Sequence, residues 1–196
     1  MLSAEEISSS LRGALRLMFG KADGLRLLDL SADGFWNSFF AIVLALPAMA
    51  VGWVGIANEL GDPDAVAVRF VVVVRLAVVD LGTWVLPLAG LALVSRRAGI
   101  GARFVHYVVA SNWASAIIAW MMLPAALARL VLEPESQVAT LLSFVLFLFS
   151  MVFTWRMTNA AIGKGAAMGT AVFAGMFVAS LAVLFALQAL LDIAVE

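Results

Sequence analysis

Five long apolar segments limit what this sequence can fold into more than any other feature. About 20 apolar residues, each rising 1.5 Å along an α-helix, are needed to cross the roughly 30 Å hydrocarbon core of a bilayer. The segments are of about this length, and 64% of the 196 residues are apolar while only 13% are charged. Soluble domains average about 25% charged residues, so this composition cannot supply a polar surface. We therefore predict an all-α, polytopic integral membrane protein with five transmembrane helices. The apolar segments cover residues 35–56, 70–94, 104–130, 138–155 and 166–191.

Positively charged residues favour one orientation of these spans, because short cytoplasmic loops retain Lys and Arg. Of the 12 Lys and Arg residues, nine precede the first span or lie in the second-to-third and fourth-to-fifth connections. The opposite connections hold only two, Arg69 and Arg129, and Arg75 falls within the second span. We expect a cytoplasmic N-terminus and a periplasmic or extracellular C-terminus. The excess of Arg over Lys, with abundant Ala, fits a bacterial inner (plasma) membrane.

The N-terminal segment 1–33 is expected to be cytoplasmic and separate from a transmembrane domain at 34–196. Ser3 followed by Glu6 has the form of a capping box that opens a helix. The first long apolar run is too late and too long for a cleaved signal peptide. The helix is amphipathic, and it can lie on the cytoplasmic leaflet, pack under its own bundle or dock a partner. Its apolar face holds Ile7, Leu11, Ala14 and Met18, and its polar face holds Ser9, Arg12 and Arg16.

Two ionisable residues of the second span are candidates for a polar site, because charge at membrane depth is costly. Arg75 lies 21 residues from Arg96, which is about 31 Å along a helix, so it is expected to snorkel at the outer interface. Asp80 lies about 7–8 Å deeper and about 140° around the helix from Arg75. Asp80 must therefore bond to another helix, bond to interfacial water or be protonated. Either it pins helices together or it forms a ligand or proton site.

Two polar residues of the third span are weaker candidates. Asn112 is near the bilayer midplane, where an amide typically bonds to a neighbouring helix. His106 follows Arg103 by three residues at the inner interface, where a hydrated imidazole needs no special role.

The fifth span carries small residues at four-residue spacing, which lets another helix approach closely. We expect this face to pack within the same chain, with a second copy as the alternative. Trp53 is expected in the outer aromatic belt. The small-residue face consists of Ala167, Ala171, Gly175 and Ala179.

Catalytic motifs are missing from the sequence. With one His and no Cys, a zinc site lacks its usual ligands. The chain also lacks a Gly-x-Ser-x-Gly elbow, a Walker loop and a dinucleotide-binding fingerprint. We expect no enzyme, no catalytic residue, no metal, no cofactor and no nucleic-acid partner.

The segments Asp-Gly-Phe-Trp-Asn-Ser-Phe-Phe at 33–40 and Phe-Thr-Trp-Arg-Met-Thr-Asn-Ala-Ala at 153–161 look like parts of uncharacterised bacterial inner-membrane proteins. Five spans after a cytoplasmic N-terminal segment resemble the topology of the Yip (Ypt-interacting protein) family. The Tyr-Gly-rich motifs of eukaryotic Yip proteins are missing, and Tyr107 is the only Tyr. The resemblance therefore implies no trafficking role and no small-GTPase partner.

Two functional hypotheses follow. The first is a non-enzymatic scaffold or accessory subunit, which associates through the N-terminal helix and the small-residue face. Its partners would be the lipid bilayer and another membrane protein or a second copy of the chain. The alternative is a transporter or channel component for a small or lipidic solute, with Asp80 and Asn112 lining the path.

Overall fold

Helices form all the regular secondary structure of the part of the chain that the structure describes. This structure is a computed structural model, and it describes residues 2–60, 66–132 and 136–192. The elements in chain order are α1 (Ala4–Met18), η1 (Ala22–Leu27), α2 (Ala32–Asn37), α3 (Phe40–Leu60), α4 (Val66–Val94), η2 (Gly101–Arg103), α5 (Phe104–Val131), α6 (Gln137–Ile162) and α7 (Ala166–Leu190).

Five helical segments are long and apolar enough to cross a membrane, which confirms the predicted fold class. The first combines α2 and α3 over Ala32–Glu59, and the third includes η2 with α5. Predicted and observed ends agree closely except at the end of α6, which continues past Trp155 to Ile162. Arg156 therefore lies on a helix and not in a connection. The helix ends where Gly163 adopts a left-handed conformation with a φ of 60°, a conformation that glycine reaches without a steric penalty.

The N-terminal helix α1 begins with the predicted capping box. The backbone N–H of Glu6 donates to the Ser3 hydroxyl at 3.2 Å, and the Glu6 carboxylate accepts from the Ser3 backbone N–H at 2.6 Å. These two bonds satisfy donors that the first helical turn leaves free.

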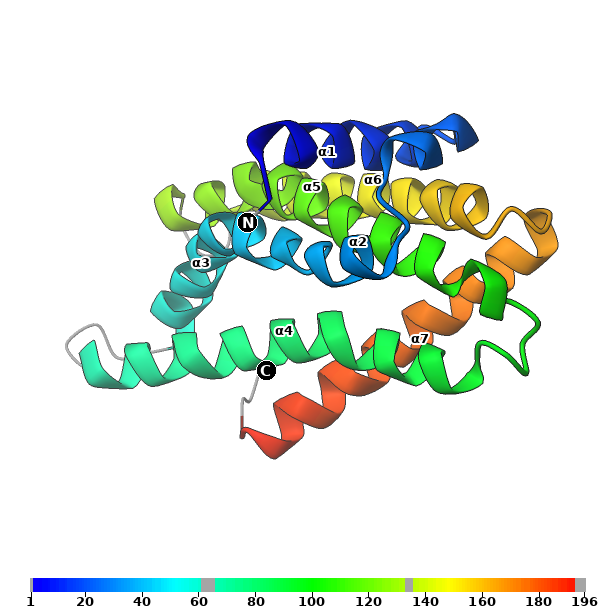
Figure 1. Cartoon of the computed structure of the whole chain (residues 1–196). Coiled ribbons are helices and arrows are strands. Elements are labelled where there is room, and N and C mark those ends of the chain that lie inside the picture. Colours follow the sequence, from blue (N-terminus) through cyan, green and yellow to red (C-terminus); the bar gives the residue numbers. More distant parts are fainter. Residues whose placement is uncertain (1, 61–65, 133–135, 193–196) are drawn as a thin grey trace.

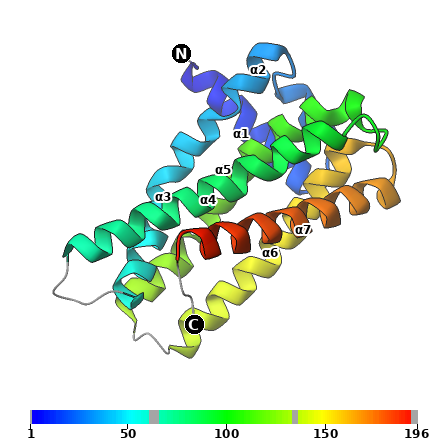
Figure 2. The same cartoon turned by 90° about the horizontal axis from the view of Figure 1, so that it is seen from below.

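The apolar face of α1 packs on α5 and α6 of its own chain. Ala14, Leu17 and Met18 are buried there, and the ring of Phe19 meets that of Phe153 edge-on at 5.4 Å between centroids. Figure 2 shows that α1 lies across the long helices and not alongside them. Of the three arrangements open to this helix, packing on its own bundle is the one observed.

The five long helices form a closed ring. α3 packs against α4 and α5, α6 packs against α5 and α7, and α7 returns to pack against α4. Figure 1 shows α4 and most of α7 as a layer below α3, α5 and α6. As a result, α4 and α5, which follow each other along the chain, lie on different sides of the ring.

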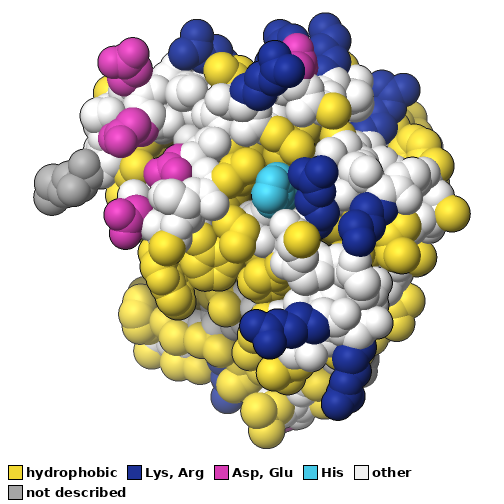
Figure 3. Space-filling model, turned by 45° about the vertical axis from the view of Figure 1, so that its right-hand side comes forward, with side chains coloured by type: hydrophobic (Ala, Val, Ile, Leu, Met, Phe, Trp, Pro, Cys, Tyr) yellow, Lys and Arg dark blue, Asp and Glu magenta, His cyan; other side chains and the backbone are white. Residues whose placement is uncertain are grey.

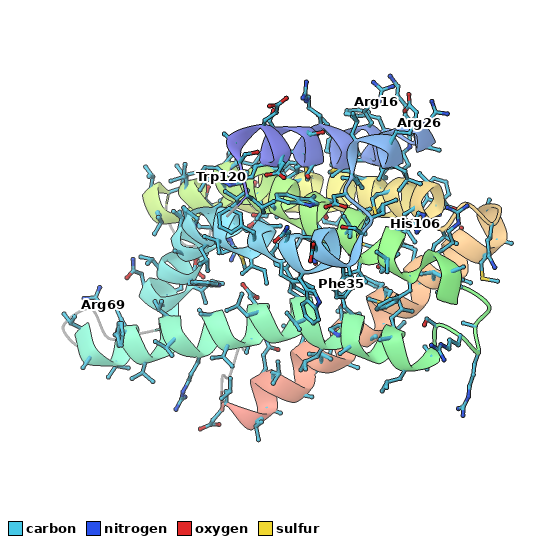
Figure 4. All side chains as sticks on the ribbon, viewed as in Figure 1. Arg16, Arg26, Phe35, Arg69, His106 and Trp120 are labelled. Atoms are coloured by element: carbon cyan, nitrogen blue, oxygen red, sulfur yellow. The ribbon has the colours of Figure 1, made fainter. Side chains whose placement is uncertain are left out.

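The connections alternate between the two ends of this ring. The connections after α4 and after α6 share one end with the C-terminal part of α1, and Figure 3 shows Lys and Arg side chains spread over this end. In Figure 4, Arg16 and Arg26 point away from the bundle here, whereas Arg69 lies at the far end. The charge asymmetry of the sequence is therefore an asymmetry between the two ends of the fold.

Candidate functional site

A partly open cavity of about 430 Å³ lies among the helices of the ring. This is within the roughly 300–1,000 Å³ range of pockets that bind small molecules. Helices α4, α5, α6 and α7 supply its walls, and α3 contributes Met49. Most of the wall is apolar, including four Met and four aromatic side chains. Its polar lining residues are Asp80, Thr83, Tyr107, Ser111, Ser115, Thr154 and Ser180.

Asp80 lies on the cavity wall and is bonded to a neighbouring helix. Its Oδ2 accepts a hydrogen bond of 2.7 Å from the indole Nε1 of Trp53, which joins α4 to α3. Trp53 is only 7% exposed, so its expected place in the outer aromatic belt is wrong. A buried indole N–H needs an acceptor, and Asp80 supplies one at membrane depth.

Arg75 does not take part in this site. Its Nη1 donates to the backbone carbonyl of Asp192 at 3.4 Å, just beyond the end of α7. A cation at a helix C-terminus is favourable because the last carbonyls carry partial negative charge. Arg75 and Asp80 therefore point to different neighbours, as their angular separation on α4 predicts.

Asn112 is fully buried, with 0% of its surface exposed, and holds three elements together. Its Oδ1 accepts from Trp84 Nε1 at 2.9 Å, and its Nδ2 donates to the Ser38 hydroxyl at 2.8 Å. That hydroxyl donates in turn to the Phe35 carbonyl at 2.7 Å. The chain of bonds links α4, α5 and the junction of α2 with α3. This agrees with the expected role of Asn112 between helices, and Asn112 does not line the cavity that contains Asp80.

His106 is half-buried near the start of α5 and lies outside the cavity (Figure 4). Its Nδ1 is buried and has no hydrogen-bond partner among the described residues. The expectation of a fully hydrated imidazole is therefore wrong for this nitrogen.

The small-residue face of α7 points away from the chain. Ala167, Ala171 and Gly175 are exposed, Ala179 is half-buried, and a Cβ on Gly175 would meet no described atom within 4 Å. The expectation that this face packs within the chain is wrong. The contact with α6 uses Gly169 instead, which lies about 200° around the helix from Ala167.

Two tryptophans, Trp53 and Trp84, bond to the predicted polar residues, and the sequence did not predict these bonds. Trp53 and Trp84 donate to the two polar candidates Asp80 and Asn112. The available signal was that an indole N–H at membrane depth needs an acceptor, and that few side-chain acceptors exist at that depth. The sequence does not show which donor meets which acceptor.

Within residues 2–60, 66–132 and 136–192, no group of three or more His, Asp or Glu side chains is placed to hold a metal ion. No protein-family model, curated protein or solved structure matches the chain. The similarity to the Yip family therefore stays a prediction. Over the described residues, fold and site together define an all-helical protein whose five membrane-length helices form a ring with a partly open cavity among them.

Proposed function

We propose that this chain is an integral membrane protein that binds a small, largely apolar or lipidic solute inside its helix ring, as a transporter or as a component of one. The observation that carries this proposal is the cavity of about 430 Å³ with Asp80 on its wall. The packing of α1 argues against the scaffold hypothesis in its first form. The apolar face that would bind a partner is used on α5 and α6 of the same chain.

The proposed location is a bacterial inner membrane, with the end that carries α1 in the cytoplasm. The support for this orientation is the concentration of Lys and Arg at that end, which the positive-inside rule places in the cytoplasm. The C-terminus would then be periplasmic.

A pair of substitutions on α7 tests the proposed binding. Ser180→Phe places a ring in the cavity, whereas Ala174→Phe places the same ring on an exposed position of the same helix. The probe is neopentylbenzene, a compact apolar molecule that matches the largely apolar wall. Equilibrium dialysis against the purified chain in detergent should give saturable binding that Ser180→Phe removes and Ala174→Phe retains. Saturable binding that is equal in all three proteins, or absent from the wild-type chain, contradicts the proposal.

A second candidate function is association with another transmembrane helix through the outward small-residue face. The observation that favours it is the open space beside Gly175, since small residues allow close helix approach. Energy transfer between labelled chains in liposomes should fall in Gly175→Leu and persist in Gly90→Leu, which enlarges an exposed glycine on α4. Equal transfer in both variants removes this candidate.

A further inference from the structure

The cavity pairs one carboxyl group with a wall that carries no cationic side chain. All 12 Lys and Arg residues fall within the described ranges, and none of them lines the cavity. Asp80 forms no ion pair with any described Lys, Arg or His side chain. Its bond from Trp53 uses Oδ2 and comes from an uncharged donor. The described residues therefore supply no cationic partner for this carboxyl group.

A carboxyl group without an ion pair in largely apolar surroundings either holds a proton or is stabilised in its charged form by a cation beside it. Aromatic rings offer a second attraction for a cation, because the face of the ring carries partial negative charge. Four aromatic side chains from three helices line the same cavity as Asp80. They are Trp84, Tyr107, Phe173 and Phe177.

The wall also indicates what kind of cation fits. Small inorganic cations such as Mg²⁺ and Ca²⁺ require about six or more oxygen ligands, or retain water in their place. Among the described lining residues, Asp80 carries the only carboxyl group, and most of the remaining polar groups are hydroxyls dispersed among apolar side chains. An ammonium group with apolar substituents matches both the single charge and the apolar wall. Unbranched Met side chains adapt to irregular shapes, and Met49, Met151 and Met176 are part of this wall.

We infer that the solute of this cavity is a monovalent organic cation, an ammonium with apolar substituents, and that Asp80 is its counter-ion. This inference rests on the proposed function, since it names the class of solute for the same cavity. The charged nitrogen would lie between the Asp80 carboxylate and the aromatic faces, and the substituents would contact the apolar wall.

The test uses two probes of the same shape that differ in charge, benzyltrimethylammonium and its carbon isostere neopentylbenzene. Binding of each is measured by equilibrium dialysis with the full chain in detergent. Asp80→Asn should weaken benzyltrimethylammonium binding by about tenfold or more and change neopentylbenzene binding by less than about twofold. Asp80→Glu should restore part of the ammonium binding. The control is Asp33→Asn, which makes the same change of charge at an exposed site and should leave both affinities as they are.

The outcomes separate this inference from the proposed function. If neopentylbenzene binds and benzyltrimethylammonium does not, or if Asp80→Asn weakens both probes alike, the counter-ion role is overturned while solute binding stands. If neither probe binds the wild-type chain, both proposals fail. Thermal melting of each variant shows whether a loss of binding merely reflects unfolding, and a folded Asp80→Asn chain that binds the ammonium as the wild type does also overturns the inference.

Discussion

Gly169 lies where α6 and α7 approach closely, and its replacement by Ala tests the packing of this pair. A Cβ at this position would lie 2.3 Å from Oδ1, 2.6 Å from Cγ and 2.8 Å from Cα of Asn159. Rotation of the amide can relieve the first two contacts, but the Cα belongs to the backbone of α6. The Asn159 amide is also held in place, because its Nδ2 donates to the Trp155 carbonyl at 2.9 Å. Gly169→Ala should therefore force the two helices apart.

The size of this effect follows from two opposing contributions. Overpacking a tightly packed site costs about 1–3 kcal/mol. Ala is favoured over Gly within a helix by about 0.8–1 kcal/mol, which offsets part of that cost. Gly175→Ala receives the same helical benefit with no steric conflict, since no described atom lies within 4 Å of its added Cβ. The difference between the two variants isolates the steric cost, so Gly169→Ala should be less stable than Gly175→Ala by about 1–3 kcal/mol.

The free energy of unfolding can be measured by titrating SDS into mixed micelles while helicity is followed by circular dichroism. Both variants change Gly to Ala on the same helix, so differences in composition and unfolded state largely cancel. If Gly169→Ala proves as stable as Gly175→Ala, the assignment of the α6 contact to Gly169 is refuted.

Two further predictions concern the polar bonds. Asn112→Leu and Trp84→Phe each break the hydrogen bond that joins α4 to α5. A double-mutant cycle of unfolding free energies should give a coupling energy of about 0.5–1.7 kcal/mol between the two positions. A coupling energy near zero contradicts the bond. At α1, the Ser3 backbone N–H and hydroxyl donate to the Glu6 carboxylate and lower its pKa. Because this pKa is lower in the folded chain, the stabilisation is present above the ordinary Glu value of about 4.3 and is lost as pH falls through the lowered value. The protection of the first amides of α1, measured relative to their intrinsic exchange rate at each pH, should therefore fall in acid. Ser3→Ala should raise the Glu6 titration midpoint measured by NMR, and an unchanged midpoint argues against the capping box.

The membrane-length helices and the charge asymmetry were predictable because both depend on local sequence. Hydropathy over about 20 residues is enough to locate a span, whatever it packs against. The capping box was predictable for the same reason, since Ser3 and Glu6 are three residues apart on one turn. At the end of α6 the local signal was incomplete, because Arg156 ends the apolar run although the helix continues to Ile162.

The packing face of α7 was not predictable in this way. Small residues occur on different sides of this helix: Gly169 is buried against α6, and Gly175, about 120° around the helix, is exposed. Spacing alone shows that each side permits close approach, but the ring decides which side meets α6. The burial of Trp53 has the same origin, since its partner Asp80 is 27 residues away on the next helix.

The ring also gives the two polar residues of the spans, Asn112 and Asp80, different surroundings. Asn112 is on α5 and faces the junction of α2 and α3, where its amide can both accept and donate. Asp80 is on α4 and reaches the cavity. In the ring α3 lies between α4 and α5, although these two helices are consecutive in the chain. The sequence predicted a bond between helices for Asn112, but it did not show that Asp80 reaches a cavity that Asn112 does not line.

Asp80 has a structural role, as the acceptor for Trp53, and a proposed role in binding a cation. Two substitutions at this position distinguish these roles. A Cβ on Gly82 would lie 2.5 Å from Leu187, so this side of α4 meets α7. Asp80 is about 200° around the helix from Gly82 and meets Trp53 on α3. An Asn at position 80 keeps an oxygen that can accept from this indole, whereas a Leu removes both the acceptor and the charge. Asp80→Asn should therefore keep the bond between α3 and α4 and lose the preference for a cation. Asp80→Leu should in addition destabilise the chain, because the Trp53 N–H is left buried without a partner.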